Sequence, residues 1–400
     1  MLLKRIFKIR IKNYYQYAAI SILILFALVQ FLLILRHKSL YLSDSYFYQH
    51  IYYEMKGDSF SEARSKILAQ VEFEKADEIS RNFYINEESY KNSLSFFKKR
   101  PLYPLSAVLV SFFVKNEYIS FLIPVLVAYL GSIIISNFFF QKSLNFESSI
   151  IATSLVVAFY PFLDWSTYFL TDTIGFFFWM MQLLLVYFFL QKKNNIFLLL
   201  FIASLIISLL LREQSVLMVP FLIIMAFSTL IVKEFKSLKK SAMQLLSFSS
   251  VIVFVYFVLS FALGQRTLLD TIVYTMNEYG FYSNNYVLNE ILRYQKEKIL
   301  EAHIVFARDL VRHHWWFLLT FLSFIGIFKV IFIKKRISLI GLLLLSSAVA
   351  SYIAIYLYPV LSYRFFFPVL ITVVYFSIKF LEDYASLGVK TNESNRRNRN

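Results

Sequence analysis

Long apolar runs separated by short polar stretches dominate this chain. A helix of about 20 apolar residues crosses the hydrocarbon core of a bilayer. The pattern therefore predicts an all-α, polytopic membrane protein with about ten transmembrane helices. The predicted spans are residues 15 to 35, 118 to 140, 149 to 163, 173 to 190, 196 to 211, 215 to 232, 243 to 263, 315 to 333, 338 to 358 and 364 to 381.

The run PLYPLSAVLVSFFV (101 to 114) decides the topology, because counting it as a span would reverse every later helix. If the N-terminus is cytoplasmic and this run does not cross, the short basic loops fall inside. Lysine and arginine are enriched in cytoplasmic loops, so we interpret the run as a juxtamembrane or re-entrant helix. The basic residues on the inside are then Lys142, Lys192, Lys193, Lys233, Lys236, Lys239, Lys240, Lys334, Lys335 and Arg336.

This topology predicts one transmembrane domain, residues 1–385, followed by a polar cytoplasmic tail, residues 386–400. Two substantial loops, 36–117 and 264–314, are placed on the outer face. Apolar positions recur in the first loop at helical spacing, which predicts two helices lying on the bilayer. The first carries Phe47, Ile51 and Met55, and the second Ile67, Leu68, Val71 and Ile79.

Composition and charge agree with a membrane protein. Hydrophobic residues make up 58% of the chain, and the net charge of +16 is divided among the short loops, which argues against nucleic-acid binding. The absence of cysteine excludes disulfides and thiolate metal sites, and the five histidines form no HxxxH pair. No cofactor is predicted with certainty, and a divalent metal is compatible with the sequence but not indicated by it.

Several residues suited to catalysis are predicted to share the outer face. An enzyme that transfers a group from a phosphate to a hydroxyl on this face would need a general base for the hydroxyl and cations for the leaving phosphate. Asp44 and Asp172 are the candidate catalytic acids, Asp44 as the base and Asp172 orienting acceptor or sugar hydroxyls. The candidate cations for a phosphate are Arg212, Arg364, Arg100, His313 and His314. The candidate acceptor or sugar contacts are Tyr103, Asp164, Glu54 and Trp315.

Each candidate also has a purely structural interpretation. Asp44 and Asp172 stand where helix-capping residues are preferred. The histidines and Trp315 fit an aromatic belt at the membrane interface. Lys98, Lys99 and Arg100 are interpreted as a solvated charge run.

The order of the motifs resembles that of GT-C glycosyltransferases, the superfamily that includes protein O-mannosyltransferases and lipid A aminoarabinose transferases. The motifs are SDSYFYQHIYYEM (43 to 55), RPLYP (100 to 104), YPFLDWSTYFLTDT (160 to 173), LLLREQS (209 to 215), RHHWWFL (312 to 318) and SYRFFFP (362 to 368). Familiar members usually carry two adjacent acids after the first span, whereas here serines flank Asp44 on both sides.

The resemblance implies inverting transfer of a sugar from a polyprenyl-phosphate donor, with Asp44 as base. Because nucleotide sugars are cytosolic, an outer-face transferase needs a donor carried by a lipid. The partners would be the lipid bilayer, this donor, and a glycan, lipid or protein acceptor. The expected location is a bacterial inner (plasma) membrane, with both termini cytoplasmic and the active site on the outer face.

Other classes stay open. An outer-face polysaccharide polymerase of the O-antigen type also uses lipid-linked sugars and arginine-bearing loops. A secondary transporter is less favoured, because the chain shows no repeated halves and only eight glycines. A structural membrane protein would not need its acids and arginines on one face.

Overall fold

The computed structural model describes residues 2–38, 43–71, 84–265, 270, 288–312, 314–357, 364 and 366–397. Every regular element in these ranges is helical. The first part of the chain forms α1 (Leu2–Leu35), α2 (Ser43–Met55), α3 (Phe60–Leu68), α5 (Glu87–Lys98), α6 (Leu102–Ser111), α7 (Glu117–Ser143), α8 (Phe146–Val157) and α9 (Tyr160–Trp165). The middle part forms α10 (Asp172–Lys192), α11 (Asn195–Leu211), η1 (Glu213–Leu217), α12 (Met218–Ile231), η2 (Lys233–Leu238) and α13 (Lys239–Ala262). The last part forms α15 (Leu288–Arg312), α16 (His314–Phe328), η3 (Lys329–Ile333), α17 (Leu339–Leu357) and α18 (Phe367–Arg397).

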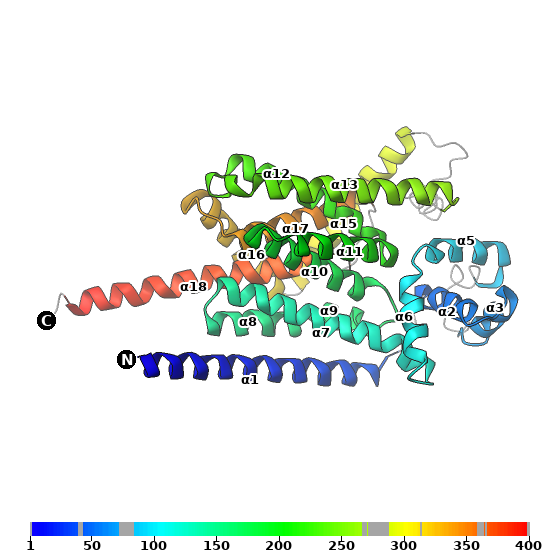
Figure 1. The fold of residues 1–400 in the computed structure, drawn as a ribbon, viewed down its shortest axis with the longest axis horizontal. Coiled ribbons are helices and arrows are strands. Elements are labelled where there is room, and N and C mark those ends of the chain that lie inside the picture. Colours follow the sequence, from blue (N-terminus) through cyan, green and yellow to red (C-terminus); the bar gives the residue numbers. More distant parts are fainter. Residues whose placement is uncertain are drawn as a thin grey trace.

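Most of the long helices run side by side along the long axis of the molecule (Figure 1). Within the described residues, six helical segments are long and apolar enough to cross a membrane, so the prediction of a helical membrane protein is confirmed at this level. They are Tyr15–Leu35, Glu117–Ser143, Asp172–Lys192, Glu213–Ile231, Lys233–Ala262 and His314–Ile333. Each overlaps a predicted span, although Lys233–Ala262 begins ten residues before the predicted span 243 to 263.

The other four predicted spans fall on helices with different properties. Three of them fall on the apolar helices Phe146–Val157, Asn195–Leu211 and Leu339–Ile355, which are shorter than the six candidate spans. The fourth falls on the first part of α18, which continues to Arg397 and so makes most of the predicted polar tail helical. The six candidate spans do not by themselves make up the predicted ten.

The predicted span 149 to 163 is two helices and not one. Helix α8 ends at Val157, and α9 begins at Tyr160 with Pro161 in its first turn. Proline has no N–H to donate to the carbonyl of the preceding turn, so α8 does not continue through Pro161, and the backbone is extended at Phe159. This break places Asp164 and Trp165 at the end of a separate short helix.

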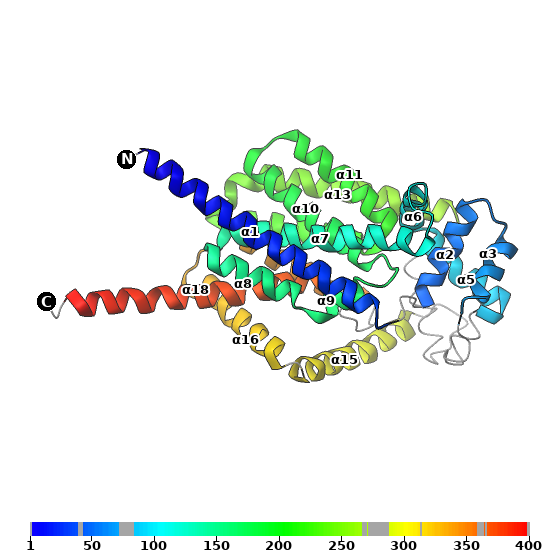
Figure 2. The same ribbon diagram turned by 90° about the horizontal axis from the view of Figure 1, so that it is seen from below.

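Helices α2, α3 and α5 form a small group, here called the cap, beyond one end of the long helices (Figures 1 and 2). The apolar face of α2 packs on protein rather than on lipid. Phe47 is 5% exposed, and its ring centroid lies 4.9 Å from that of Phe97 and 5.8 Å from that of Tyr84. The apolar face of α2 is therefore covered by protein, and the placement of this helix on the bilayer stays a prediction. Of the second predicted helix, Ile67 is buried in α3, and Ile79 lies outside the described residues.

Helix α6 joins the cap to the bundle. It has ten residues, about 15 Å of helix, which is half the thickness of a hydrocarbon core. It lies across the end of the long helices, and both chain termini lie at the opposite end (Figure 1). This geometry fits a juxtamembrane helix at 101 to 114.

Replacing Phe47 with Ala should loosen the cap. Removing a buried aromatic ring typically costs about 3–5 kcal/mol, so the F47A protein should be cleaved faster by protease within residues 36 to 117. The measurement is limited proteolysis in detergent, followed by mass spectrometry of the fragments.

Met55 provides the matched control, because it lies on the same helix but is 38% exposed. The M55A protein should be cleaved at nearly the wild-type rate. Equal cleavage of F47A and M55A would contradict the packing of α2 in the cap.

Candidate functional site

Four charged residues, predicted from sequence to share one face, meet where the cap joins the bundle. Asp44 lies in the first turn of α2, Asp172 begins α10, Arg212 separates α11 from η1, and Arg364 precedes α18. Arg212 Nη1 lies 2.5 Å from Asp172 Oδ1, and Arg364 Nε lies 3.6 Å from the same oxygen. Arg364 Nη1 lies 3.5 Å from Asp44 Oδ2. We call these four residues the charged cluster.

The charged cluster runs from the interior of the protein to its surface. The exposed fractions of the side chains rise from 4% for Asp172 and 9% for Arg212 to 21% for Arg364 and 36% for Asp44. A buried carboxylate is stable only when cations or hydrogen-bond donors compensate for its lost hydration. Asp172 therefore depends on the two arginines, whereas Asp44 is accessible to another molecule.

The local backbone directs Arg212 into the cluster. Helix α11 ends at this residue, which is extended, with φ −159° and ψ 124°. The side chain leaves the helix, and its Nε donates a hydrogen bond to Gln214 Oε1 at 3.0 Å. Arg364 lies over the ring of Trp165 at 5.0 Å, a cation–π distance.

Arg100 lies in a second layer of this region. Its Nη1 donates to the Tyr48 hydroxyl at 3.4 Å, and that hydroxyl is 3.1 Å from Thr171 Oγ1, the residue before Asp172. Among the described residues, the buried Arg100 Nε has no hydrogen-bond partner. The guanidinium also lies 4.5 Å from the Phe96 ring. Arg100 thus adds a positive charge behind the cluster.

Lys99 is also buried, so the sequence-based interpretation of residues 98 to 100 as a solvated run is wrong for this lysine. Its Nζ lies 2.6 Å from Glu213 Oε1, and the side chain is 0% exposed. Burial lowers the pKa of the Lys99 amine, while Glu213 acts in the opposite direction. Tyr256 donates to the same carboxylate at 3.3 Å. This ion pair joins the end of the cap to the residue that follows Arg212.

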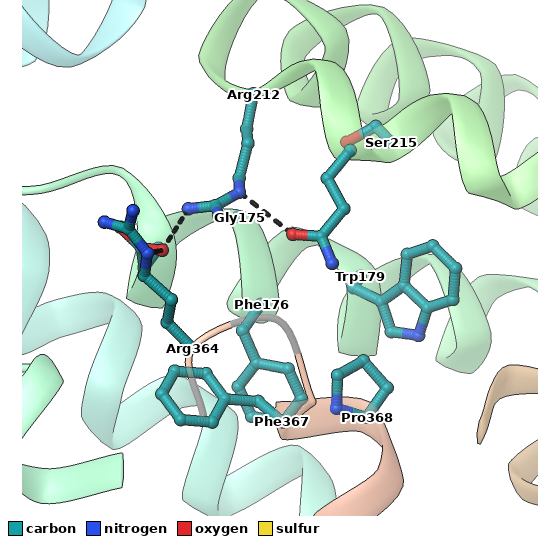
Figure 3. A pocket seen from close by; sticks show the side chains of 10 residues that line it. Gly175, Phe176, Trp179, Arg212, Ser215, Arg364, Phe367 and Pro368 are labelled. Carbon is teal, nitrogen blue, oxygen red and sulfur yellow. Dashed lines mark hydrogen bonds and ion pairs between the residues drawn. The ribbon is translucent and has the colours of Figure 1, made fainter. Parts of the chain in front are cut away.

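A pocket opens beside the charged cluster and encloses about 310 Å³ of space that no atom fills, its mouth included. Its wall changes from charged to aromatic, with the arginines at one side and the aromatic rings at the other (Figure 3). Trp179 is held there by donating a hydrogen bond from Nε1 to Ser347 Oγ at 2.7 Å. The lining residues are Asp172, Gly175, Phe176, Trp179, Arg212, Gln214, Ser215, Arg364, Phe367 and Pro368.

Several other predicted site residues have structural partners elsewhere. Tyr103 is fully buried and donates to the Phe121 carbonyl at 3.3 Å, so it lies in the core of the protein. Glu54 lies in the cap and pairs with Lys98 at 2.9 Å. Asp164 pairs with Lys38 at 2.7 Å.

The predicted His and Trp cluster lies at the start of α16. His314 and Trp315 are exposed, and the Trp315 ring lies 4.8 Å from that of Trp316. Trp316 in turn packs against Phe159 at 4.3 Å. His313 lies outside the described residues. In the described part of the chain, no group of three or more His, Cys, Asp or Glu side chains is arranged to hold a metal ion.

Comparison with family models, with curated proteins and with solved structures gave no match.

Removing Arg212 should destabilise the protein strongly. The variant R212Q leaves Asp172 buried with only the more distant Arg364, and breaking a buried ion pair typically costs about 3–5 kcal/mol. The double variant D172N/R212Q should lose less than the sum of the single losses, because no carboxylate then remains buried. The measurement is thermal unfolding of the four purified proteins in detergent.

The pair Arg293 and Glu297 is the control, because its side chains are 75% and 50% exposed. Exposed pairs contribute about 0–1 kcal/mol, so R293Q should unfold at nearly the wild-type temperature. Strictly additive losses for D172N and R212Q would show that the two side chains do not stabilise each other.

Proposed function

We propose that this protein is an integral membrane glycosyltransferase of the GT-C type. It transfers a sugar, with inversion, from a polyprenyl-phosphate donor to an acceptor hydroxyl at the outer face of the membrane. The supporting observation is the contact of an accessible carboxylate, Asp44, with Arg364, which lines a pocket together with Arg212. A base and a pair of phosphate-binding cations are the parts that this reaction requires.

The arginines are assigned to the donor phosphate. A guanidinium offers a planar fork of N–H donors that matches two phosphate oxygens. Arg364 is suited to this role because its contacts with Asp44 and Asp172, at 3.5 and 3.6 Å, are longer than the usual 2.7–2.9 Å of a charged hydrogen bond. Arg212 and Arg100 supply further positive charge. The proposed involvement of His313 and His314 stays a sequence-based prediction.

Asp44 is assigned as the general base. Its carboxylate accepts the proton of the acceptor hydroxyl, and the hydroxyl oxygen attacks the anomeric carbon of the sugar. The bond between that carbon and the phosphate oxygen breaks, and polyprenyl phosphate leaves with the bonding electrons. Asp172 is mostly buried and contacts both arginines, so we assign it to holding Arg212 and Arg364 in place.

The proposal includes a topology with ten spans, cytoplasmic termini and a bacterial inner membrane location. The basic loops at the ends of the predicted spans support this orientation. The position of both termini at the end opposite the cap agrees with it (Figure 1). The acceptor is a glycan, a lipid or a protein.

Replacing Asp44 with Asn should abolish most of the transfer. General base catalysis typically contributes about 10²–10⁴-fold, so D44N should be slower by about 100-fold or more. The assay reconstitutes purified protein in nanodiscs, supplies a panel of undecaprenyl-phosphate hexoses and pentoses with host membranes, and measures release of undecaprenyl phosphate. E54Q is the matched control, because Glu54 lies on the same helix but pairs with Lys98 in the cap.

Near wild-type turnover by folded D44N would overturn the assignment of the base. Growth of a long polysaccharide product, in place of single transfer, would favour the polymerase alternative.

The orientation can be tested separately by labelling single cysteines, since the chain contains none of its own. A cysteine at Lys236 or Lys240 should react with a membrane-impermeant maleimide only after the cells are opened. A cysteine at the exposed residue Lys56 in the cap should react in intact cells. The reverse pattern would contradict the outer-face proposal.

A further inference from the structure

Gly175 lies directly beneath the side chain of Arg212. It is the third residue after Asp172 in α10, so both residues lie on the same face of that helix. A Cβ atom built on Gly175 would stand 2.9 Å from Arg212 Cδ, 3.5 Å from Arg212 Cβ and 3.8 Å from Arg212 Cγ. The Arg212 stem therefore passes close to the glycine, and Figure 3 shows Arg212 reaching toward this part of α10.

Helix geometry does not explain a glycine at this position. A glycine inside a helix is less favourable than alanine by about 1 kcal/mol, and Gly175 does not have the positive φ angle that Gly57 and Gly264 have. The contact with Arg212 supplies a reason, because no carbon–carbon contact as short as 2.9 Å is tolerated without a shift of one of the groups. The missing side chain is what lets Arg212 pass over α10.

We propose that Gly175 is a positioning residue that sets the reach of Arg212 toward Asp172 and the pocket. A methyl group at this position would push the Arg212 stem outward and move its guanidinium away from Asp172 Oδ1, from which it now lies 2.5 Å. It would also narrow the pocket, which Gly175 lines. The consequence for phosphate binding rests on the proposed function, but the consequence for the ion pair does not.

The first test is a double-variant cycle on thermal stability, measured in detergent with wild type, G175A, R212A and G175A/R212A. G175A alone should lower Tm by several degrees. In the R212A background the same change should leave Tm unchanged or raise it. Only the ordinary contact at 3.5 Å with the residue 212 Cβ then remains, and alanine is the better helix former. A change that acts only through Arg212 must be non-additive in this way.

Gly326 provides the matched structural control. A Cβ there would meet the carbonyl oxygen of Phe376 at 2.5 Å, so this glycine allows α16 and α18 to approach each other. G326A should lower Tm equally with Arg212 present or removed. If G175A also lowers Tm equally in both backgrounds, Gly175 is a helix-packing glycine and the proposal is overturned.

The second test measures binding of undecaprenyl phosphate in nanodiscs. G175A should bind this lipid about tenfold more weakly than wild type, the equivalent of weakening one charge-assisted hydrogen bond. G175A/R212A should bind it as R212A does. No binding by wild type would count against the proposed function alone, because the stability cycle still tests Gly175. If G175A binds the lipid as tightly as wild type and the stability cycle is additive, the positioning role of Gly175 is overturned. The proposed function would not be affected by that result.

Discussion

The buried carboxylate of Asp172 is the constraint on which this site depends. It begins a helix that is long and apolar enough to cross a membrane, and its side chain is 4% exposed. An isolated charge in such surroundings is strongly unfavourable, so the fold must bring cations to it. Arg212 and Arg364, the residues that do so, come from segments 40 and 192 positions further along the chain. One acid thus ties α10 to the end of α11 and to the start of α18.

Arg100 adds a third arginine to the two that face the acids of the charged cluster. Asp44 and Asp172 face Arg212 and Arg364, and Arg100 stands behind them with its Nε unsatisfied among the described residues. Lys99 lies apart from the cluster and faces the acids Glu213 and Asp270. Two arginines, Arg212 and Arg364, line the pocket, and guanidinium groups are suited to an anion, which is the chemical reason for proposing a phosphate-linked ligand.

The sequence predicted that the residues of the charged cluster share one face of the membrane, because each lies near the predicted outer end of a span. Alternating spans place all such ends on the same side. The partners were not predictable. Apolar residues recur every fourth position in α2, and this spacing produces an apolar face that can pack on lipid or on protein. Only the tertiary structure shows that this face packs inside the cap. Glu54 stands in the same motif as Asp44, and Tyr103 in the same motif as Arg100. The sequence does not reveal that Glu54 pairs with Lys98 or that Tyr103 is buried in the core. The importance of Gly175 depends on an atom 37 residues away, which no local pattern reveals.

Arg364 contacts the proposed base, Asp44, and is also assigned to the donor phosphate. In this structure it lies between Asp44 and Asp172, at distances longer than a good charged hydrogen bond. A phosphate that offers the same guanidinium two short contacts competes favourably with both carboxylates. When Arg364 turns toward the phosphate, Asp44 Oδ2 loses this contact and can accept the proton of the acceptor hydroxyl. In the proposed mechanism, binding of the donor would therefore itself free the base for the acceptor. Asp172, fixed by Arg212, would keep the rest of the cluster in place while Arg364 changes partner.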